Sequence, residues 1–220
     1  MKRSVFSLLF LSALLAFTPP AEARSCSNEV TPAATLLLPY FEVSLGAPTG
    51  ITTVFSVNNA SFQPVLAKAE VWSDLGVPIF GFNIYLKGFD VQTINLRDIL
   101  VNGLLPQTGP APSFPGCVGV LPPATIPANL RADYQRALTG QPSGLLSGLC
   151  AGRRFTDNIA RGYMTIDTVN NCTLRYQGDP GYFAGDITNQ NVLWGDFFFA
   201  EQAAGRAQGA PLVHIESDPT

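Results

Sequence analysis

The sequence predicts a mainly β, antiparallel domain, a β-sandwich of immunoglobulin-like type with a loop-and-helix insertion at about residues 102–157. Three observations predict this class. Apolar and polar side chains alternate with a period of two in several short segments that are rich in β-branched residues. Only a few turn-forming residues separate these segments, and such short connections join antiparallel strands. Four cysteines follow an export signal, which is typical of disulfide-stapled domains.

The first 23 residues are interpreted as a secretory signal peptide. Lys2 and Arg3 supply the positive start, residues 5–17 are almost wholly apolar, and residues 21–23 (Ala-Glu-Ala) form a cleavage site between small residues. The apolar run is shorter than a bilayer-spanning helix. We therefore expect a secreted, periplasmic or cell-surface protein.

Residues 24–220 are predicted to form a single mature domain with no transmembrane segment of its own. Two alternatives stay open, an uncleaved membrane anchor and a lipid anchor on Cys26, although Arg24 departs from the small residues that lipid attachment needs. Removing the signal peptide leaves 15 acidic and 11 basic residues, a net charge of −4, without any basic cluster. Nucleic-acid binding therefore lacks its electrostatic basis.

The first half of the mature chain contains most of the strand signals. A first strand is expected over residues 34–45, and Pro39 predicts that it is bent, bulged or at an edge. Further strands are expected over residues 51–58, 65–72, 78–87 and 91–96. These last four are predicted to form an antiparallel meander, either as one sheet or as one corner of a sandwich. One helical turn is expected over residues 97–101.

Gly and Pro dominate the predicted insertion, with one helix inside it. The helix is expected to start near Thr125, with Pro127 in its first turn, and to end at Gly140. Its apolar stripe consists of Leu130, Tyr134 and Leu138. After the insertion, strands are expected over residues 159–169, 173–176, 192–200 and 211–216, with a polar loop over residues 178–191. The chain stops soon after the last strand, which predicts a product truncated at its C-terminus.

The four cysteines predict two disulfides. Three connectivities exist, and we favour Cys117–Cys150 because both lie in the loop-rich insertion; Cys26–Cys172 then follows by elimination. Zinc is disfavoured because there is no Cys-x-x-Cys pair and His214 is the single histidine.

Six segments together resemble a family of uncharacterised secreted bacterial β-rich proteins. They are residues 38–43 (LPYFEV), 55–59 (FSVNN), 71–76 (VWSDLG), 95–98 (NLRD), 160–163 (ARGY) and 191–196 (NVLWGD). The resemblance covers most of the mature chain and implies the same order of β motifs in longer proteins. That family has no established activity, so the resemblance carries no catalytic residue to this chain.

No catalytic string is present. His214 alternates with apolar neighbours in a predicted strand, and the Gly144–Gly148 segment lacks the spacing of a nucleophile elbow. Four acids on or near predicted strands are candidates for a two-carboxylate hydrolase, although mid-strand acids usually face solvent or pair with arginine. They are Asp167, Asp196, Glu201 and Glu216. The 95–98 segment is interpreted as a local ion pair or turn cap.

Two binding alternatives remain. Asp179, Asp186 and Asn189 lie in a loop rich in oxygen ligands and are candidate calcium ligands, although turns favour the same residue types. Aromatic side chains could line a sugar-binding or partner-binding face, although a sandwich core is the simpler explanation. They are Trp72, Tyr85, Tyr163, Trp194, Phe197, Phe198 and Phe199.

The sequence therefore favours a non-catalytic, exported interaction or surface-associated module without a required cofactor. Its partner would be an unidentified protein or glycan. The alternative is a secreted carbohydrate-active protein, either a sugar-binding module or a two-carboxylate hydrolase.

Overall fold

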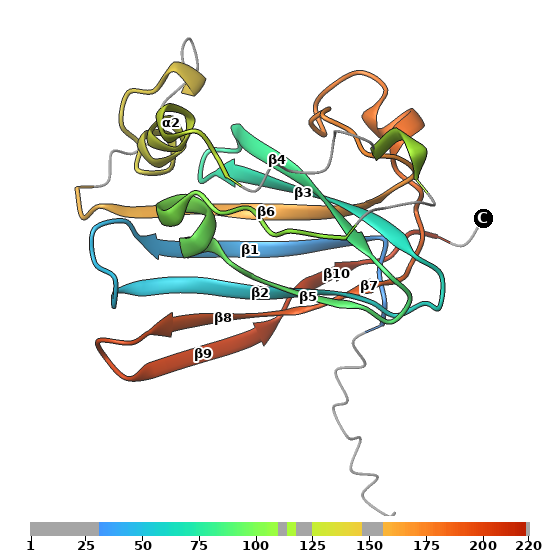
Figure 1. The fold of residues 1–220 in the computed structure, drawn as a ribbon, viewed down its shortest axis with the longest axis horizontal. Coiled ribbons are helices and arrows are strands. Elements are labelled where there is room, and N and C mark those ends of the chain that lie inside the picture. The colour runs from blue at the N-terminus through green and yellow to red at the C-terminus, as the bar shows by residue number, and fades with distance from the viewer. Residues whose placement is uncertain (1–30, 110–113, 118–124, 147–155, 219–220) are drawn as a thin grey trace, which may run out of the picture.

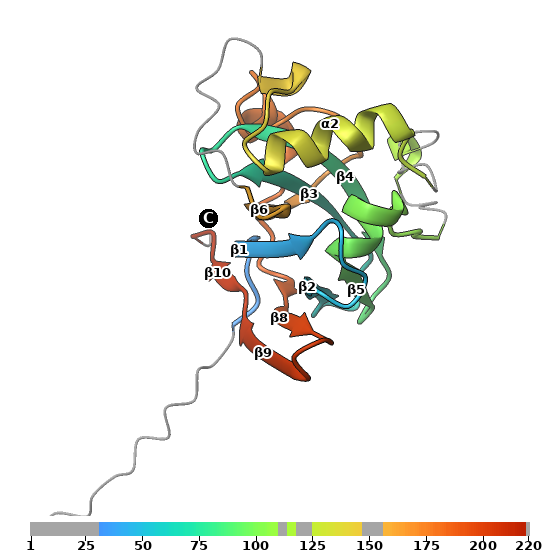
Figure 2. The same ribbon diagram turned by 90° about the vertical axis from the view of Figure 1, so that its left-hand side faces the viewer.

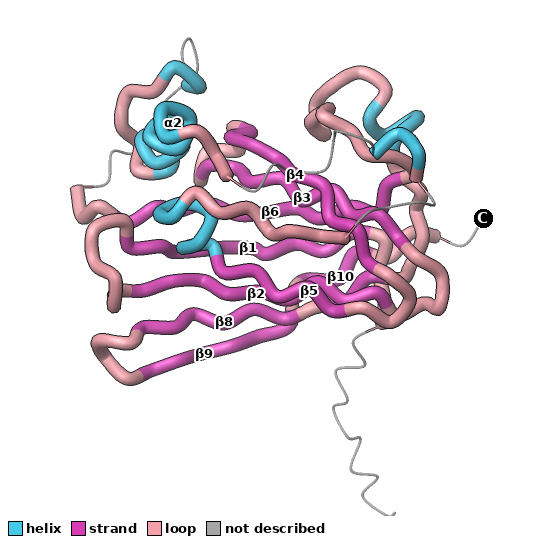
Figure 3. The backbone as a smooth tube through the Cα atoms, viewed as in Figure 1, coloured by secondary structure: helices cyan, strands magenta, loops and turns pink. Residues whose placement is uncertain are grey.

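The computed structural model describes residues 31–109, 114–117, 125–146 and 156–218. Two five-stranded antiparallel sheets form the body of the fold, so the predicted mainly β sandwich is confirmed (Figure 1 and Figure 3). No helix in this part of the chain is long and apolar enough to cross a membrane.

We call the two sheets sheet I and sheet II. Sheet I runs β10 (Val213–Ile215), β1 (Thr35–Ser44), β6 (Ile159–Val169), β3 (Val65–Ser73) and β4 (Pro78–Leu86). Sheet II runs β5 (Val91–Asn95), β2 (Ile51–Asn59), β8 (Asp196–Glu201) and β9 (Arg206–Pro211), and β7 (Leu193–Trp194) also pairs with β2.

The strands β2 to β5 form a corner and not a single sheet. Strand β2 pairs with β5 in sheet II, whereas β3 pairs with β4 in sheet I. Of the two arrangements expected for residues 51–96, the sandwich corner is the one that forms. The chain crosses between the sheets twice because each strand has one apolar face, and both faces must be buried in the same core.

The core lies between the two sheets. Alternation directs every second side chain of each long strand inward, as with Ala67, Ala69 and Val71 of β3. Strand β1 keeps this pattern despite Pro39, because the register slips by one residue between Leu38 and Phe41. Large inward side chains include Phe41, Phe55, Leu36, Leu38, Ile84 and Leu86.

Strands β1 and β2 lie side by side where the two sheets meet (Figure 1). No backbone ladder joins them. Instead, the Thr53 hydroxyl accepts a hydrogen bond from the Glu42 amide and donates one to the Glu42 carbonyl, both at 3.0 Å. The side chain of Thr53 thus replaces one rung of a sheet.

The Arg97 side chain holds the turn between β1 and β2. Its guanidinium group donates hydrogen bonds to four backbone carbonyls of that turn and its flanks, those of Ser44, Ala47, Gly50 and Ile51, at 2.7 to 3.3 Å. The 95–98 segment is thus a structural clamp, which agrees with the turn-cap interpretation and not with an ion pair. A helical turn follows over Asp98–Asn102, close to the expected 97–101.

The predicted helix is present as α2 (Ala128–Leu138). It starts directly after Pro127 and ends before Gly140, which has a left-handed φ of 69°. Tyr134 stacks on Phe80 of β4 with the ring centroids 4.6 Å apart, so the helix packs beside one end of sheet I (Figure 2).

Two expectations for the C-terminal part are wrong, and one strand there was not predicted. Residues 173–176 do not form a strand, because the Thr173 carbonyl accepts hydrogen bonds from the Lys68 and Asn83 side chains in place of a ladder. The expected strand 192–200 is divided at Gly195, where a Cβ would lie 2.1 Å from the Ser56 carbonyl oxygen. Strand β9 was not predicted. The expected last strand over residues 211–216 is present in shorter form as β10 (Val213–Ile215).

The expected disulfide pairing is also wrong. Cys117 bonds to Cys172, with the two Cα atoms 4.9 Å apart, so neither Cys117–Cys150 nor Cys26–Cys172 forms. Cys26 and Cys150 lie outside the described residues. A small apolar cluster brings the bonded pair together on the outer side of sheet I, and sequence spacing gives no hint of it. Its other members are Leu66, Tyr85, Val169 and Phe114.

Candidate functional site

A cleft of about 410 Å³ opens where the edge of sheet I meets the β8–β9 hairpin. We call it the seam cleft. Its lining comes from four strands and consists of Tyr40, Glu42, Ile51, Phe199, Glu201, Arg206, Ala207 and Gln208. A volume in this range suits a small-molecule ligand.

Strand alternation places the principal side chains on the cleft walls. After the bulge in β1, Phe41 and Val43 point into the core, so Tyr40 and Glu42 point outward on the other face of that strand. On β8, Phe199 and Glu201 share one face in the same way. The Tyr40 and Phe199 rings meet across the cleft with their centroids 6.2 Å apart and their planes tilted by 53°.

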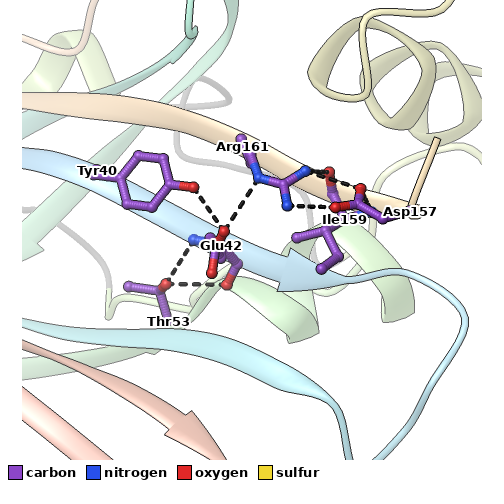
Figure 4. Close-up of polar contacts among 6 residues, drawn as sticks. All are labelled: Tyr40, Glu42, Thr53, Asp157, Ile159 and Arg161. Carbon is purple, nitrogen blue, oxygen red and sulfur yellow. Dashed lines mark hydrogen bonds and ion pairs between the residues drawn. The ribbon is translucent and has the colours of Figure 1, made fainter. Parts of the chain in front are cut away.

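Glu42 is the centre of a hydrogen-bonded network on one wall. Its Oε1 accepts hydrogen bonds from the Tyr40 hydroxyl at 2.7 Å and from Arg161 Nε at 3.1 Å (Figure 4). Arg161 is directly opposite Glu42 in the β1–β6 register. The two terminal nitrogens of Arg161 donate hydrogen bonds to the two carboxylate oxygens of Asp157, and Nη1 also donates one to the Ile159 carbonyl.

The contacts within this network shift the pKa values of three of its residues. Burial and the hydrogen bond to Glu42 raise the pKa of Tyr40 to about 12, so its hydroxyl stays a donor at neutral pH. The hydrogen bonds to Arg161 lower the pKa of Asp157 to about 2. The same contact with Asp157 raises the pKa of Arg161 above its ordinary value. Within this wall, Tyr40 and Arg161 therefore stay protonated and Asp157 stays ionised at neutral pH.

The opposite wall carries a second acid–base pair. Arg206 Nε lies 2.8 Å from Glu201 Oε2, and the pair spans the turn between β8 and β9. Gln208, two residues further along β9, offers an amide with both a donor and an acceptor. The cleft is thus bounded by aromatic rings, two ion-paired carboxylates and one amide.

The described lining contains no serine, cysteine or histidine. A nucleophile activated by an adjacent base is therefore not supported at the cleft. His214 lies elsewhere, in β10, with its Nδ1 2.6 Å from the Thr31 carbonyl oxygen. It serves as a backbone contact.

The four acids proposed for a hydrolase do not converge. Asp167 is buried on the outer face of β6, whereas Asp196 and Glu201 lie on opposite faces of β8. Glu216 follows β10, where it accepts a hydrogen bond from Thr31. Only Glu201 reaches the seam cleft. The acid that joins it there is Glu42, which the sequence did not single out.

Two of the three candidate calcium ligands are engaged in hydrogen bonds of their own loop. Asp186 accepts from Arg175 and from the Thr173 hydroxyl, and Asp179 accepts from the Tyr176 amide. Asn189 adopts a left-handed turn conformation. Across the described residues, no group of three or more His, Cys, Asp and Glu side chains could hold a metal ion. The calcium site stays a prediction.

The aromatic side chains separate into three groups. Tyr85 and Phe197 are buried, as the core explanation requires. Trp194 and Phe198 are exposed on the outer face of sheet II. The rest are half-buried: Phe199 in the cleft, and Trp72 and Tyr163, which stack in parallel with centroids 5.8 Å apart on the outer face of sheet I. They do not form a single row.

Sequence reasoning also missed a buried polar cluster at the other end of that face. We call it the covered cluster, and it consists of Lys68, Glu70, Asn83, Asp167 and Tyr182. Asp167 accepts hydrogen bonds from the Tyr182 hydroxyl at 2.7 Å and from Gln177. The only sequence signal of this cluster was the presence of charged residues in the middle of β3 and β6. That pattern did not indicate that the segment after β6 folds over these residues.

Burial shifts the pKa values in the covered cluster. It raises the pKa of Glu70 to about 7, against partial compensation from the Gln177 amide and Lys68. It lowers the pKa of Lys68 below its ordinary value. The Glu70 Oε1 atom is buried without a hydrogen-bond partner. The chemistry of this cluster is internal and stabilises the packing of the segment above it.

Comparisons with known proteins add no assignment. The chain matches no family model, no curated protein and no solved structure.

Proposed function

We propose that the protein is an exported, non-catalytic binding module whose seam cleft holds a neutral saccharide unit. The observation that carries the proposal is the composition of the cleft: two aromatic rings in contact, with ion-paired hydrogen-bonding groups on both β1 and the β8–β9 hairpin. The confirmed sandwich fold and the Cys117–Cys172 disulfide are compatible with an extracytoplasmic location.

The rings provide the apolar part of sugar recognition. A pyranose has faces lined by C–H groups, and these pack well on aromatic side chains. Tyr40 is exposed enough to be reached from solvent, and Phe199 anchors the other side against the core. A saccharide can therefore bury one face without displacing either ring.

The polar groups match a ligand with many hydroxyls. Sugar hydroxyls donate and accept, and the cleft offers carboxylate acceptors, a guanidinium donor and an amide with both functions. Each carboxylate already faces an arginine, Glu42 with Arg161 and Glu201 with Arg206. Because each cleft carboxylate already has a cationic partner within the protein, a neutral ligand fits better than an ionic one.

The hydrolase alternative is less well supported by the same geometry. A glycosidase needs one protonated carboxylic acid to protonate the leaving group. Both cleft acids are ion-paired instead, and Glu42 additionally accepts the Tyr40 hydroxyl. The groups are arranged to hold a ligand and not to transfer a proton.

A glycan-array screen followed by calorimetric titration of the best ligand tests the proposal. We expect Tyr40→Ala to weaken binding about tenfold, because one stacked ring contributes about 1 kcal/mol or slightly more. Phe62→Ala is the matched control, since Phe62 is an exposed aromatic residue outside the cleft. A protein that binds no glycan, or binds equally well without the Tyr40 ring, would refute the proposal. Release of new reducing ends from the bound glycan would support the hydrolase instead.

A further inference from the structure

Strand β9 is an open sheet edge. It is the last strand of sheet II and forms one arm of a hairpin at the rim of the molecule (Figure 2). All six of its residues are exposed, and its pairing with β8 runs without a bulge. No strand among the described residues pairs with its outer side. A continuous run of backbone donors and acceptors is therefore available there.

The other three sheet edges are short or have other segments packed near them. Strand β10 is only three residues long. Strand β4 has α2 packed beside it through the Tyr134–Phe80 stack. Residues 104–106 lie near β5, since they line one pocket together with residues 92–95 of that strand. Proteins normally shorten, cover or charge such edges, so the unprotected β9 stands apart.

We propose that β9 is an interaction surface for a second copy of this chain, and that the two β9 strands pair antiparallel about a twofold axis at Gln208. A twofold axis perpendicular to the sheet keeps the same face of both copies on the same side of the combined sheet. Because side chains alternate between the faces, an odd-numbered residue must then pair with an odd-numbered residue of the partner, and an even-numbered one with an even-numbered one. Centring on Gln208 pairs residues 206–210 completely. It also leaves Pro211, which has no N–H to donate, outside the ladder.

The side chains of β9 are compatible with this register. Gln208 faces the partner's Gln208, and the two amides can hydrogen-bond to each other. Ala207 faces the partner's Gly209, and the Phe198 ring of the adjoining β8 already covers the glycine position on that face, so only the small Ala207 side chain has to fit beside it. Arg206, the only charged residue of the strand, faces the partner's Ala210. The two arginines are then four residues apart, about 13 Å along the strands, which exceeds the Debye length of about 8 Å at physiological salt.

Self-pairing also has a consequence for the seam cleft. Gln208 and Arg206 line that cleft from β9, on the face that carries Phe199 and Glu201. Because the axis preserves the faces, the two clefts lie on the same side of one continuous sheet and adjoin at the paired Gln208 residues. A dimer would therefore present two neighbouring ligand sites to one extended chain.

Sedimentation equilibrium of the purified protein tests the pairing, and we expect a concentration-dependent doubling of the mass. Gln208→Lys places two lysines directly opposite each other on the axis and should abolish the doubling. Gln202→Lys, which adds the same charge in the exposed hairpin turn, should leave it intact. Both positions are exposed, so neither variant threatens folding.

A crosslinking experiment fixes the register. Opposed residues of an antiparallel pair have Cα atoms about 4.5–5.5 Å apart, within the range that a disulfide spans. Gln208→Cys should give a covalent dimer on mild oxidation, and Gln202→Cys should not. A protein that stays monomeric up to its solubility limit, or a dimer unaffected by Gln208→Lys, would overturn the proposal. Mass is measured without ligand, so a monomer that still binds glycan refutes the pairing alone.

Discussion

The outer face of sheet I contains two acid–base assemblies that differ in what covers them. At one end, the covered cluster lies beneath residues 172–187. The Cys117–Cys172 disulfide links the start of this covering segment to the 114–117 segment. At the other end, the network of Glu42 and Arg161 borders the seam cleft and stays in contact with solvent. Both come from the same alternation of neighbouring strands. The covering segment therefore determines whether the charged side chains take part in internal packing or remain available to a ligand.

The difference teaches where function is placed in this fold. In the covered cluster, nearly every polar atom forms a hydrogen bond within the protein. Asp167, for example, accepts hydrogen bonds from Thr35, Gln177 and Tyr182. In the open network, the ion pairs orient side chains but leave acceptor capacity facing the cleft. Removing one group should therefore cost much stability at the first end and little at the second.

The largest effect is expected from Lys68→Ala. The Lys68 ammonium donates to the Thr173 carbonyl at 3.0 Å and offsets the charge of Glu70. Its loss leaves buried acids uncompensated, which costs about 3–5 kcal/mol of unfolding free energy. Urea titration measures the change, and Lys87→Ala, an exposed lysine, is the control expected to stay near wild type. Equal effects at both lysines would contradict the assignment of Lys68 as a buried partner.

An intermediate effect is expected from pH. The pKa of Glu70 is about 7 in the folded protein against an ordinary 4.5. Between these values the unfolded chain releases the proton while the folded chain keeps it, so stability falls as pH rises from 4.5 to 7. The full loss contributed by Glu70 is about 3 kcal/mol at 1.36 kcal/mol per unit. Urea midpoints at pH 5 and pH 8 measure it, and Glu70→Gln should flatten the dependence. An unchanged slope in that variant would assign it to another group.

The smallest stability effect is expected from Glu42→Gln in the open network. Glu42 remains partly solvated, and a surface ion pair contributes about 0–1 kcal/mol. Saccharide binding should nevertheless weaken, because Tyr40 and Arg161 lose the carboxylate that orients them. Denaturation and calorimetry on the same preparation separate the two quantities. A loss of stability as large as that of Lys68→Ala would remove the distinction between the covered and open assemblies.

Local pattern predicted most of the scaffold. The strands β1 to β6 lie within one or two residues of the segments where alternation placed them, and α2 lies between the Pro127 and Gly140 signals. Prediction failed where one segment depends on a distant one. Residues 173–176 have strand-forming composition, but side chains from β3 and β4 capture their backbone. Strand β9 contains Ala, Gly and Gln without alternation, and it forms because β8 offers an edge.

The candidate site was predicted least well for the same reason. Glu201 was among the acids considered, and Phe199 among the aromatics, yet Tyr40, Glu42 and Arg161 were not given a role. Their meeting depends on the β1–β6 register and on a one-residue bulge, neither of which is visible in the chain itself. The wrong disulfide has the same origin, since sequence spacing does not report which loops lie over the same sheet.

By itself, then, the sequence determined which segments form strands and which of their faces are apolar, because side-chain periodicity acts over a few residues and is written directly in the chain. Only the tertiary structure decided the strand partners, the bonded cysteines and the residues that meet in the seam cleft. Those depend on bringing segments more than a hundred residues apart into one register, as with Glu42 and Arg161, and that choice is made by burial of the whole core at once.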